Sequence, residues 1–306
     1  MGGSGGGTSY GMEDIDADAL RDRARRDLQQ QELLTDINSY LAEQLTAFND
    51  RDTETVNDRL EQIAEALGEA VEGLDRLLFG GSIAKHTYVD GLSDVDALII
   101  LRGNQPDNPD QLIAAFADAL RAALPKSTVA DIQPGRLAVT VTYTDGTQIQ
   151  LLPARRTGET LSIASEDGRA WRDIRPRKFA EKLTEVNQAN NDGVVPAIKL
   201  AKPILDRLPE SQRLSGYHLE AIAVDAFKHY DGPTSRQAML RHLLDHAAGA
   251  VLKPTGDITG QSVRIDTHLG PADSVDRQRI SASIRRIVSK MDSAANVDDY
   301  KDLFGD

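Results

Sequence analysis

The stretch Leu77-Leu78-Phe79-Gly80-Gly81-Ser82 is followed, after eleven intervening residues, by Asp94-Val95-Asp96 and the apolar run Ala97–Leu101. In the first part, a short apolar run meets two glycines and a serine, after which Ile83–Tyr88 can form a helical turn. Eleven residues are enough for one helix and a return to an adjacent strand. Because Ala97–Leu101 has the length and composition of a buried strand, this stretch predicts an α/β unit.

Asp94 and Asp96 stand two residues apart at the start of the predicted strand, so both carboxylates should point to one face of it. Two negative charges held this close repel each other unless a cation lies between them. Mg²⁺, or Mn²⁺ in its place, has the hard-oxygen preference that suits a site shared with phosphates. On its own, an Asp-x-Asp pair also fits a solvated strand start or a helix-capping loop.

The Gly80-Gly81-Ser82 segment adds a second, independent signal. Small residues let backbone N–H groups approach phosphate oxygens, and a following helical turn contributes the positive end of its dipole. The Ser82 hydroxyl can donate a hydrogen bond to the same phosphates. A simple Gly-Ser turn before a helix is the alternative. Both signals together, with Ser93-Asp94 leading into an apolar strand, favour a site for a metal ion and a nucleoside triphosphate.

The bulk composition sets wide limits. The chain has 306 residues, of which 40% are hydrophobic and 27% are charged, with a net charge of −13. This length allows one large domain or two packed domains. The negative charge argues against non-specific nucleic-acid binding, which depends on clustered Lys and Arg. It does not exclude nucleotides, because a divalent cation reconciles acidic residues with phosphates.

The sequence has no feature of a membrane or secreted protein. No segment approaches the roughly 18 to 20 apolar residues that cross a bilayer, and no secretory signal begins the chain. The absence of cysteine excludes disulfides and thiolate metal sites and fits a reducing cytosol. We therefore expect a cytoplasmic protein without a membrane partner.

Apolar residues at helical spacing predict a long helix over residues 16–49 and a second helix whose apolar side runs from Val56 to Leu77. The second helix would pack into a core or, alternatively, against a coiled-coil partner. A helix is also expected over Asp110–Leu124, and strands at 136–143 and 148–152 should form a hairpin around Asp145-Gly146.

After Pro153 the chain is expected to be mostly helical. Five segments have helical spacing of their apolar residues: Pro176–Asn190, Val194–Leu208, Gly216–Tyr230, Thr234–Ala248 and Arg277–Ala295. We expect a Gly/Ser-rich tail over residues 1–11, a catalytic half over 12–160 and a helical half over 161–306, with a cleft between the two halves.

The segment from Gly80 to Thr87, together with Ser93–Asp96, resembles the signature of the DNA polymerase β-like nucleotidyltransferases. Within them it is most similar to the bacterial cGAS/DncV-like group (CD-NTases), the cyclic-oligonucleotide synthases of antiphage CBASS systems. The resemblance continues in softer motifs in the same order, over roughly residues 20–305: Leu151–Ala154, Trp171, Pro176, Ile198–Lys202, Leu214–Glu220 and Tyr300–Gly305. It implies an α+β fold: a mixed sheet with long N-terminal helices, then a helical bundle.

The resemblance also implies roles for individual residues. Gly80, Gly81 and Ser82 would hold the triphosphate of ATP, GTP or another NTP, and Asp94 and Asp96 would bind two Mg²⁺ ions. The other implied phosphate and base contacts are Lys202 in preference to Lys199, then Ser215, with Tyr217 stacking on a nucleobase. Lys85 could reach a phosphate. The alternatives are an exposed helix face for the lysines and a core aromatic for Tyr217.

One expected group is missing from the strand that leads into Leu-Pro-Ala. The family expects a third carboxylate there, which completes the metal site and takes the proton from the attacking hydroxyl. This chain instead has Gln148 and Gln150 on one face of that strand. A glutamine amide carries no charge and cannot act as a base. The loss of general-base assistance alone costs about 10² to 10⁴ in rate.

Three explanations remain open: an inactivated variant, a weak enzyme that uses water or a substrate phosphate as base, or a nucleotide-binding pseudoenzyme. We predict a nucleotidyltransferase that makes a cyclic di- or oligonucleotide signal in antiphage defence, with a regulatory protein of the same operon as a partner. The rival function is a transferase that nucleotidylates RNA ends or proteins. Product bases, linkage and ring size depend on the shape of the pocket.

Overall fold

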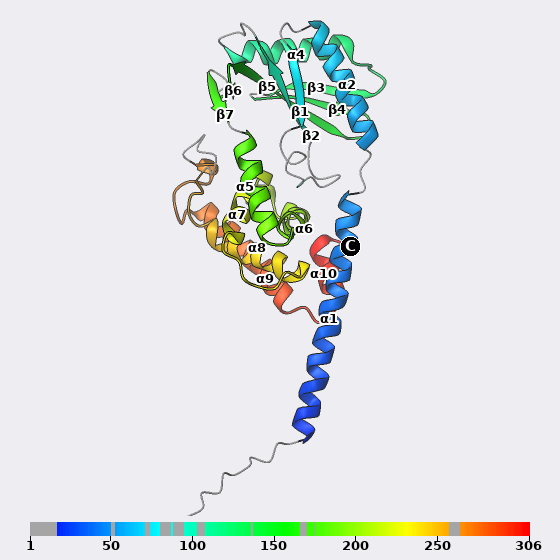
Figure 1. Ribbon diagram of the computed structural model, residues 1–306, viewed down its shortest axis with the longest axis vertical. Helices are drawn as coiled ribbons and strands as arrows, with labels where there is room; N and C mark the ends of the chain where they lie inside the picture. The colour runs from blue at the N-terminus through cyan, green and yellow to red at the C-terminus, as the bar shows by residue number, and fades with distance from the viewer. Residues whose placement is uncertain are drawn as a thin grey trace, which may run out of the picture.

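The structure of the protein is a computed structural model. It describes residues 17–49, 53–70, 74–79, 87, 95–102, 108–135, 137–165, 170–174, 176–256 and 264–306. A sheet with two covering helices forms one half of the molecule, and a group of helices forms the other half, with the long first helix running along it (Figure 1). The predicted α+β fold with N-terminal helices, a mixed sheet and a helical second half is confirmed.

The described strands form a seven-stranded mixed sheet. The order is β1-β2-β5-β4-β3, and β6 and β7 extend the sheet beyond β5. Strands β2 and β5 run parallel, whereas the other pairs are antiparallel. The strands are β1 (Leu74–Phe79), β2 (Val95–Leu101), β3 (Val129–Pro134), β4 (Val139–Tyr143), β5 (Gln148–Thr157), β6 (Thr160–Ala164) and β7 (Trp171–Ile174).

The two faces of the sheet have different environments. Helices α2 (Thr53–Ala70) and α4 (Pro109–Ala123) cover one face, where apolar residues of both helices form a core with alternate residues of β2, β4 and β5. The opposite face carries a small cluster that includes Leu98, Ile100 and Ala154. Because side chains alternate along a strand, positions 96, 148 and 150 belong to this second face.

The helical half has its own, larger core. It contains residues of helices α5 to α10 and also Ile37, Tyr40, Leu41 and Leu45 of α1 (Ala17–Asn49). The described residues of α1 before Leu33 are exposed, so the first part of this helix extends away from the core (Figure 1). The other helices are α5 (Pro176–Ala189), α6 (Val194–Asp206), α7 (Gly216–Phe227), α8 (Arg236–Ala250), α9 (Val275–Asp292) and α10 (Asp298–Phe304).

Several predicted elements are confirmed. The long first helix, the helix at 110–124 and the five helices after residue 176 are all present within a few residues of their predicted ends. The hairpin is also present: β4 pairs with β5, and Gly146 in the turn has a φ of 89°, which glycine adopts without steric cost. Leu60, Ile63 and Leu67 of α2 are buried in the sheet core, so core packing is the correct interpretation of that helix.

One expectation is wrong. The apolar side of the second helix was expected to reach Leu77, but α2 ends at Ala70 and Leu74–Phe79 is strand β1, paired with β2. A short apolar run fits either element, and the pairing decides which one forms. The chain after Pro153 is mostly helical, as expected, but its helices begin only at Pro176, because β5 continues to Thr157 and β6 and β7 follow. Gly158, with a φ of 60°, turns the chain between β5 and β6.

Among the described residues, no helix combines the length and the apolar character that a membrane crossing needs.

Candidate active site

The parallel pair β2 and β5 brings two predicted site positions together. In the register of this pair, Asp96 lies opposite Gln150, and Ala97 lies opposite Leu151. In a parallel sheet, partner positions on neighbouring strands project to the same face. Gln150 is therefore the β5 position that faces Asp96, whereas Gln148 lies two residues earlier, at the exposed start of β5. Of the two candidate glutamines, the register therefore pairs Gln150, and not Gln148, with Asp96.

Five predicted site residues lie outside the described residues: Gly80, Gly81, Ser82, Lys85 and Asp94. Their predicted contacts with phosphate and metal stay predictions. Among the described residues, no three His, Cys, Asp or Glu side chains come together as a metal site. Mg²⁺ is hard and prefers oxygen ligands. Asp and Gln, the residue types at the paired positions 96 and 150, both carry oxygen ligands of this kind, although the amide supplies no charge.

Thr87 is a described residue between the two parts of the motif, and it connects them to the helical half. It is fully buried. Its carbonyl oxygen accepts a hydrogen bond from Lys202 Nζ of α6 at 2.6 Å, and its hydroxyl donates a short hydrogen bond to Glu220 Oε1 of α7. Lys202 Nζ and Glu220 Oε1 also form an ion pair at 3.5 Å. Sequence analysis identified Lys202 but missed Thr87 and Glu220.

The two candidate lysines of α6 point to different places. Lys199 Nζ donates a hydrogen bond of 2.5 Å to Asn49 Oδ1, at the end of α1. Lys202, one helical turn later, is buried against α7 and Thr87. The structure thus brings Lys202 to Thr87, whereas Lys199 contacts Asn49.

Ser215 and Tyr217 lie at the start of α7. Ser215 is the N-cap residue, and its side-chain oxygen accepts a hydrogen bond of 3.2 Å from the backbone N–H of His218. Its own hydroxyl hydrogen can still be donated to an anion. Tyr217 is half-buried, and its ring centroid lies 4.8 Å from that of Phe179 on α5. This contact fits a partly packed aromatic whose remaining surface faces outward.

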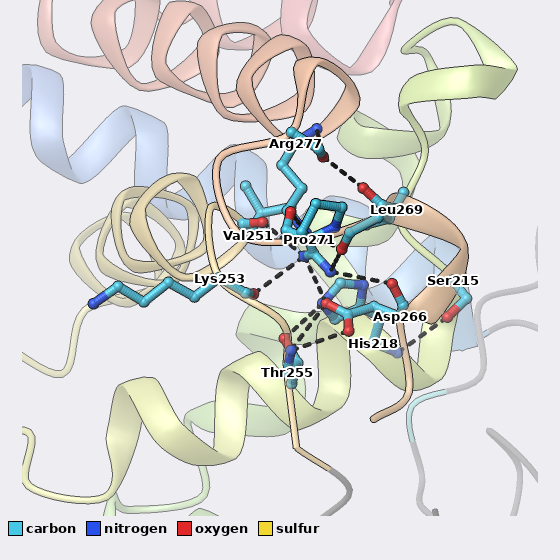
Figure 2. A network of polar contacts seen from close by, with 11 residues as sticks. Ser215, His218, Val251, Lys253, Thr255, Asp266, Leu269, Pro271 and Arg277 are labelled. Carbon is cyan, nitrogen blue, oxygen red and sulfur yellow. Dashed lines mark hydrogen bonds and ion pairs between the residues drawn. The ribbon is translucent and has the colours of Figure 1, made fainter. Parts of the chain in front are cut away.

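A buried polar network fixes the loop beside the start of α7 (Figure 2). Its centre is the ion pair between Arg277 Nη1 and Asp266 Oδ2, at 2.8 Å and with both side chains fully buried. Both oxygens of Asp266 accept from the backbone N–H of Thr255, at 3.0 Å. His218 Nε2 lies 3.0 Å from Thr255 Oγ1 and 3.5 Å from Asp266 Oδ2. The network thereby links α7 to the segments at 251–256 and 264–271 and to α9.

The ionisation of this network follows from burial and charge. Burial lowers the pKa of His218 from 6.5 to about 4, which the nearby Asp266 opposes and Arg277 reinforces. His218 is therefore neutral at pH 7. Burial opposes ionisation of Asp266, but the hydrogen bonds from Arg277 and from the backbone N–H of Thr255 outweigh it, and the pKa of Asp266 is lowered. The buried charges are thus one arginine and one aspartate, which neutralise each other.

Among the residues that the sequence-based prediction missed, Glu220 does have a signal in the sequence. Glu220 stands within the run Leu219–Val224, whose other members are apolar and buried. A charged residue in such a run requires a buried partner. His218, Asp266 and Arg277 have no comparable local signal, because they are brought together from separate segments.

A surface hollow of about 400 Å³ lies elsewhere in the helical half, lined by Leu34, Thr35, Asn38, Ser39, Ala42 and Arg236. None of these residues belongs to the candidate site, so this hollow does not mark it.

The fold and the site can be compared with known proteins. No protein-family model matches the chain. A curated relative, the cyclic AMP-AMP-AMP synthase of Escherichia coli (strain MS 115-1), is 30% identical over 101 residues, which make up 31% of this chain and 32% of that protein. The match thus spans about a third of the relative's length.

Three solved structures share the fold over most of their length. CdnC of Escherichia coli MS115-1 with ATP has a TM-score of 0.64 and 14% identity, over 83% of this chain and 91% of that chain. The Bradyrhizobium diazoefficiens CD-NTase CdnG with GTP has a TM-score of 0.61 and 14% identity, over 84% and 91%. Vibrio cholerae DncV, a cyclic AMP-GMP synthase, in complex with nonhydrolyzable GTP has a TM-score of 0.62 and 12% identity, over 95% and 91%.

The chain has the CD-NTase fold. CdnC has also been solved as a CdnC:HORMA-deltaN complex, whose CdnC matches with a TM-score of 0.62. The likeness agrees with the resemblance to CD-NTases at the level of the fold. In this fold, Asp96 and Gln150 lie on the neighbouring strands β2 and β5, and Lys202 lies on α6.

Proposed function

We propose that this chain is a nucleotidyltransferase that binds an NTP between its sheet and its helical half. The observation that carries the proposal is the placement of Asp96 opposite Gln150 on the parallel strands β2 and β5. The hydrogen bonds and the ion pair that join Thr87, Lys202 and Glu220 also support it. Nucleotide-bound relatives with the same fold, CdnC with ATP and CdnG with GTP, support a nucleotide as the ligand.

The residues have separate tasks in this proposal. Gly81 and Ser82 hold the triphosphate through backbone N–H groups and a hydroxyl, and Ser215 and Lys202 contact it from the helical half. Tyr217 stacks on a base. Asp94 and Asp96 hold Mg²⁺, which when bound neutralises charge on the α-phosphate and on the departing pyrophosphate. A 2′- or 3′-hydroxyl of a second nucleotide attacks the α-phosphate, and pyrophosphate leaves.

The product is proposed to be a cyclic di- or oligonucleotide. Two observations support it. The curated relative that matches over 101 residues is a cyclic AMP-AMP-AMP synthase, and DncV, with the same fold, is a cyclic AMP-GMP synthase. Closing the ring repeats the same step: the free hydroxyl of the linear product attacks the remaining triphosphate. Such a signal belongs to antiphage defence, as in the CBASS group that the motif resembles.

Gln150 favours a second candidate function. At the position opposite Asp96 an amide stands where a base is needed, and an amide cannot take a proton. The chain would then bind NTP and release no pyrophosphate, acting as a nucleotide-binding pseudoenzyme. A weak enzyme, in which water or a substrate phosphate takes the proton, lies between the two candidates.

The deciding experiment compares the wild-type chain with Gln150→Asp, and with Gln148→Asp as a matched control on the same strand. Each is incubated with the four NTPs and Mg²⁺, and the products are identified by mass spectrometry while pyrophosphate release is measured. We expect Gln150→Asp to raise the rate by about 10² or more, the typical range for a general base, and Gln148→Asp to leave it unchanged. If Gln150→Asp releases no pyrophosphate while ATP or GTP binds, the chain is a binding protein.

The same assay tests the rival transferase function. If labelled ATP becomes attached to RNA or to a protein and no small cyclic product forms, the chain modifies macromolecules.

A regulatory protein is a further proposed partner, supported by the CdnC:HORMA-deltaN complex of a protein with the same fold. We propose that the reaction takes place in the cytoplasm, because a chain without cysteines suits a reducing environment.

A further inference from the structure

Lys202 has an environment that is unusual for a cation. Its side chain is 8% exposed, and it lies against the first turn of α7: a Cβ added to Gly216 would be 3.7 Å from both Cε and Nζ of Lys202. Gly216 is the first residue of α7. The N-terminus of a helix carries a partial positive charge, which disfavours a second positive charge. Burial disfavours the charged form as well.

Glu220 offsets both effects that disfavour the charged form of Lys202, its burial and the nearby helix N-terminus. It follows Gly216 by four residues, so the two lie on the same side of α7. Its side chain is 1% exposed, and Oε1 lies 3.5 Å from Lys202 Nζ. Lys202 thus faces the carboxylate of Glu220 and the carbonyl of Thr87, while Lys199 of the same helix reaches Asn49 instead. A negative charge at this distance in a buried place favours the protonated form of the lysine.

The carboxylate of Glu220 has a second contact, with the chain segment that connects β1 to β2. Its Oε1 accepts the hydrogen bond from the Thr87 hydroxyl. Thr87 follows Ser82 by five residues and precedes Asp94 by seven. The same oxygen atom therefore touches the cation of α6 and the segment that carries both halves of the motif.

We propose that Glu220 is a positioning residue of the nucleotide site. It keeps Lys202 protonated beside the N-terminus of α7 and anchors Thr87 to the helical half. This inference rests on the proposed function, because the charge on Lys202 serves a triphosphate. A protonated lysine, the Ser215 hydroxyl and the backbone N–H groups at the start of α7 then form one anion-binding group, whose strength depends on a carboxylate that itself does not touch the nucleotide.

Glu220→Gln isolates the charge, because the glutamine carbonyl can still accept from Thr87. The substitution removes the negative charge 3.5 Å from Lys202 Nζ and leaves the burial and the positive helix end unchanged, so Lys202 loses its proton at a lower pH than in the parent chain. We expect the affinity of this variant for Mg²⁺–NTP to fall by roughly tenfold as the pH rises from about 7.5 to 9.5, the size of one lost charge-assisted hydrogen bond. The wild-type affinity stays level over this range.

The measurement is the Kd of the four Mg²⁺–NTPs by titration calorimetry, with circular dichroism to confirm folding. Glu210→Gln, an identical change at an exposed glutamate, is the matched control and should keep the wild-type profile. Glu220→Asp retains the charge and should restore a level profile. Lys202→Met should bind weakly because it lacks the positive charge. Its affinity should be the same at every pH because no titrating group remains.

Thr87→Val tests the second contact independently, in case Glu220→Gln does not fold. It removes the hydroxyl and leaves the ion pair, so we expect a level pH profile with a lower affinity. The inference is overturned if Glu220→Gln binds with the wild-type profile, or if Thr87→Val binds with the wild-type affinity. If the wild-type chain binds no NTP at any pH, the proposed function itself has failed, which is a different result from binding that is indifferent to Glu220.

Discussion

Arg277 offers a sharp test of how the helical half is held together, because one guanidinium serves many acceptors. Its Nη1 donates to the carbonyls of Val251 and Lys253 and to the Asp266 carboxylate. Its Nη2 and Nε donate to the Asp266 and Gly270 carbonyls and to that of Pro271. We predict that Arg277→Met strongly destabilises the fold, since methionine leaves these acceptors and a buried carboxylate without a donor (Figure 2).

The magnitude follows from the burial. Both side chains of the Arg277–Asp266 pair are 0% exposed, and removing one partner of a fully buried pair costs about 3–5 kcal/mol. That is a large share of the roughly 5–15 kcal/mol that stabilises a typical protein. For a protein of this size class each kcal/mol lowers the Tm by about 2–4 °C, so we expect a fall of about 6–20 °C.

The assay is thermal unfolding at pH 7, followed by circular dichroism. Arg279→Met is the matched control two residues further along α9, because its pair with Asp276 has side chains 66% and 62% exposed, and such pairs contribute about 0–1 kcal/mol. Adding Asp266→Asn to Arg277→Met should recover part of the loss by removing the unpaired charge. If Arg277→Met and Arg279→Met melt at the same temperature, the network does not stabilise the fold and the reasoning is wrong.

Two further predictions concern protonation and packing. His218 has a pKa near 4 in the folded state against 6.5 unfolded. The unfolded state therefore binds the extra proton between these values, and stability is lost as the pH falls from about 6.5 to 4, by up to roughly 3 kcal/mol. His218→Gln should reduce this loss in chemical unfolding curves at pH 7 and 4.5, and an unchanged difference would contradict the assignment. Leu41→Ala, at a fully buried position, should lower the free energy of unfolding in urea by about 2–5 kcal/mol. Its control Leu28→Ala, at a leucine that is 56% exposed, should change it by less than about 0.5 kcal/mol. Equal losses would show that α1 is packed differently.

Periodicity predicted the helices and missed most of the sheet. Long helices repeat their apolar residues many times, so α1 and the helices after residue 176 were visible from the sequence. Strand β1 was taken as the end of a helix, and β6 and β7 were missed, because four to six residues give too few repeats to distinguish the periods. Their strand conformation depends on pairing, of β1 with β2, of β6 with β5 and of β7 with β6, and this pairing is tertiary information.

Short sequence motifs supplied candidate site residues, and the structure supplied their neighbours. Asp96 and Gln150 were identified from local patterns, and the register of β2 and β5 then showed which glutamine faces the aspartate. Glu220 was visible in the sequence as a charge in an apolar run but could not be assigned a partner. Thr87 and Lys202 are 115 residues apart, so their contact could not be read from the sequence.

The first two helices belong to different cores. Helix α1 packs into the core of the helical half, and α2 packs on the sheet, although residues 50–52 alone separate them. The chain passes between the halves again from β7 to α5, between Ile174 and Pro176. A rotation of one half relative to the other would leave both cores intact, and among the described residues it would strain the hydrogen bonds that Thr87 makes with α6 and α7.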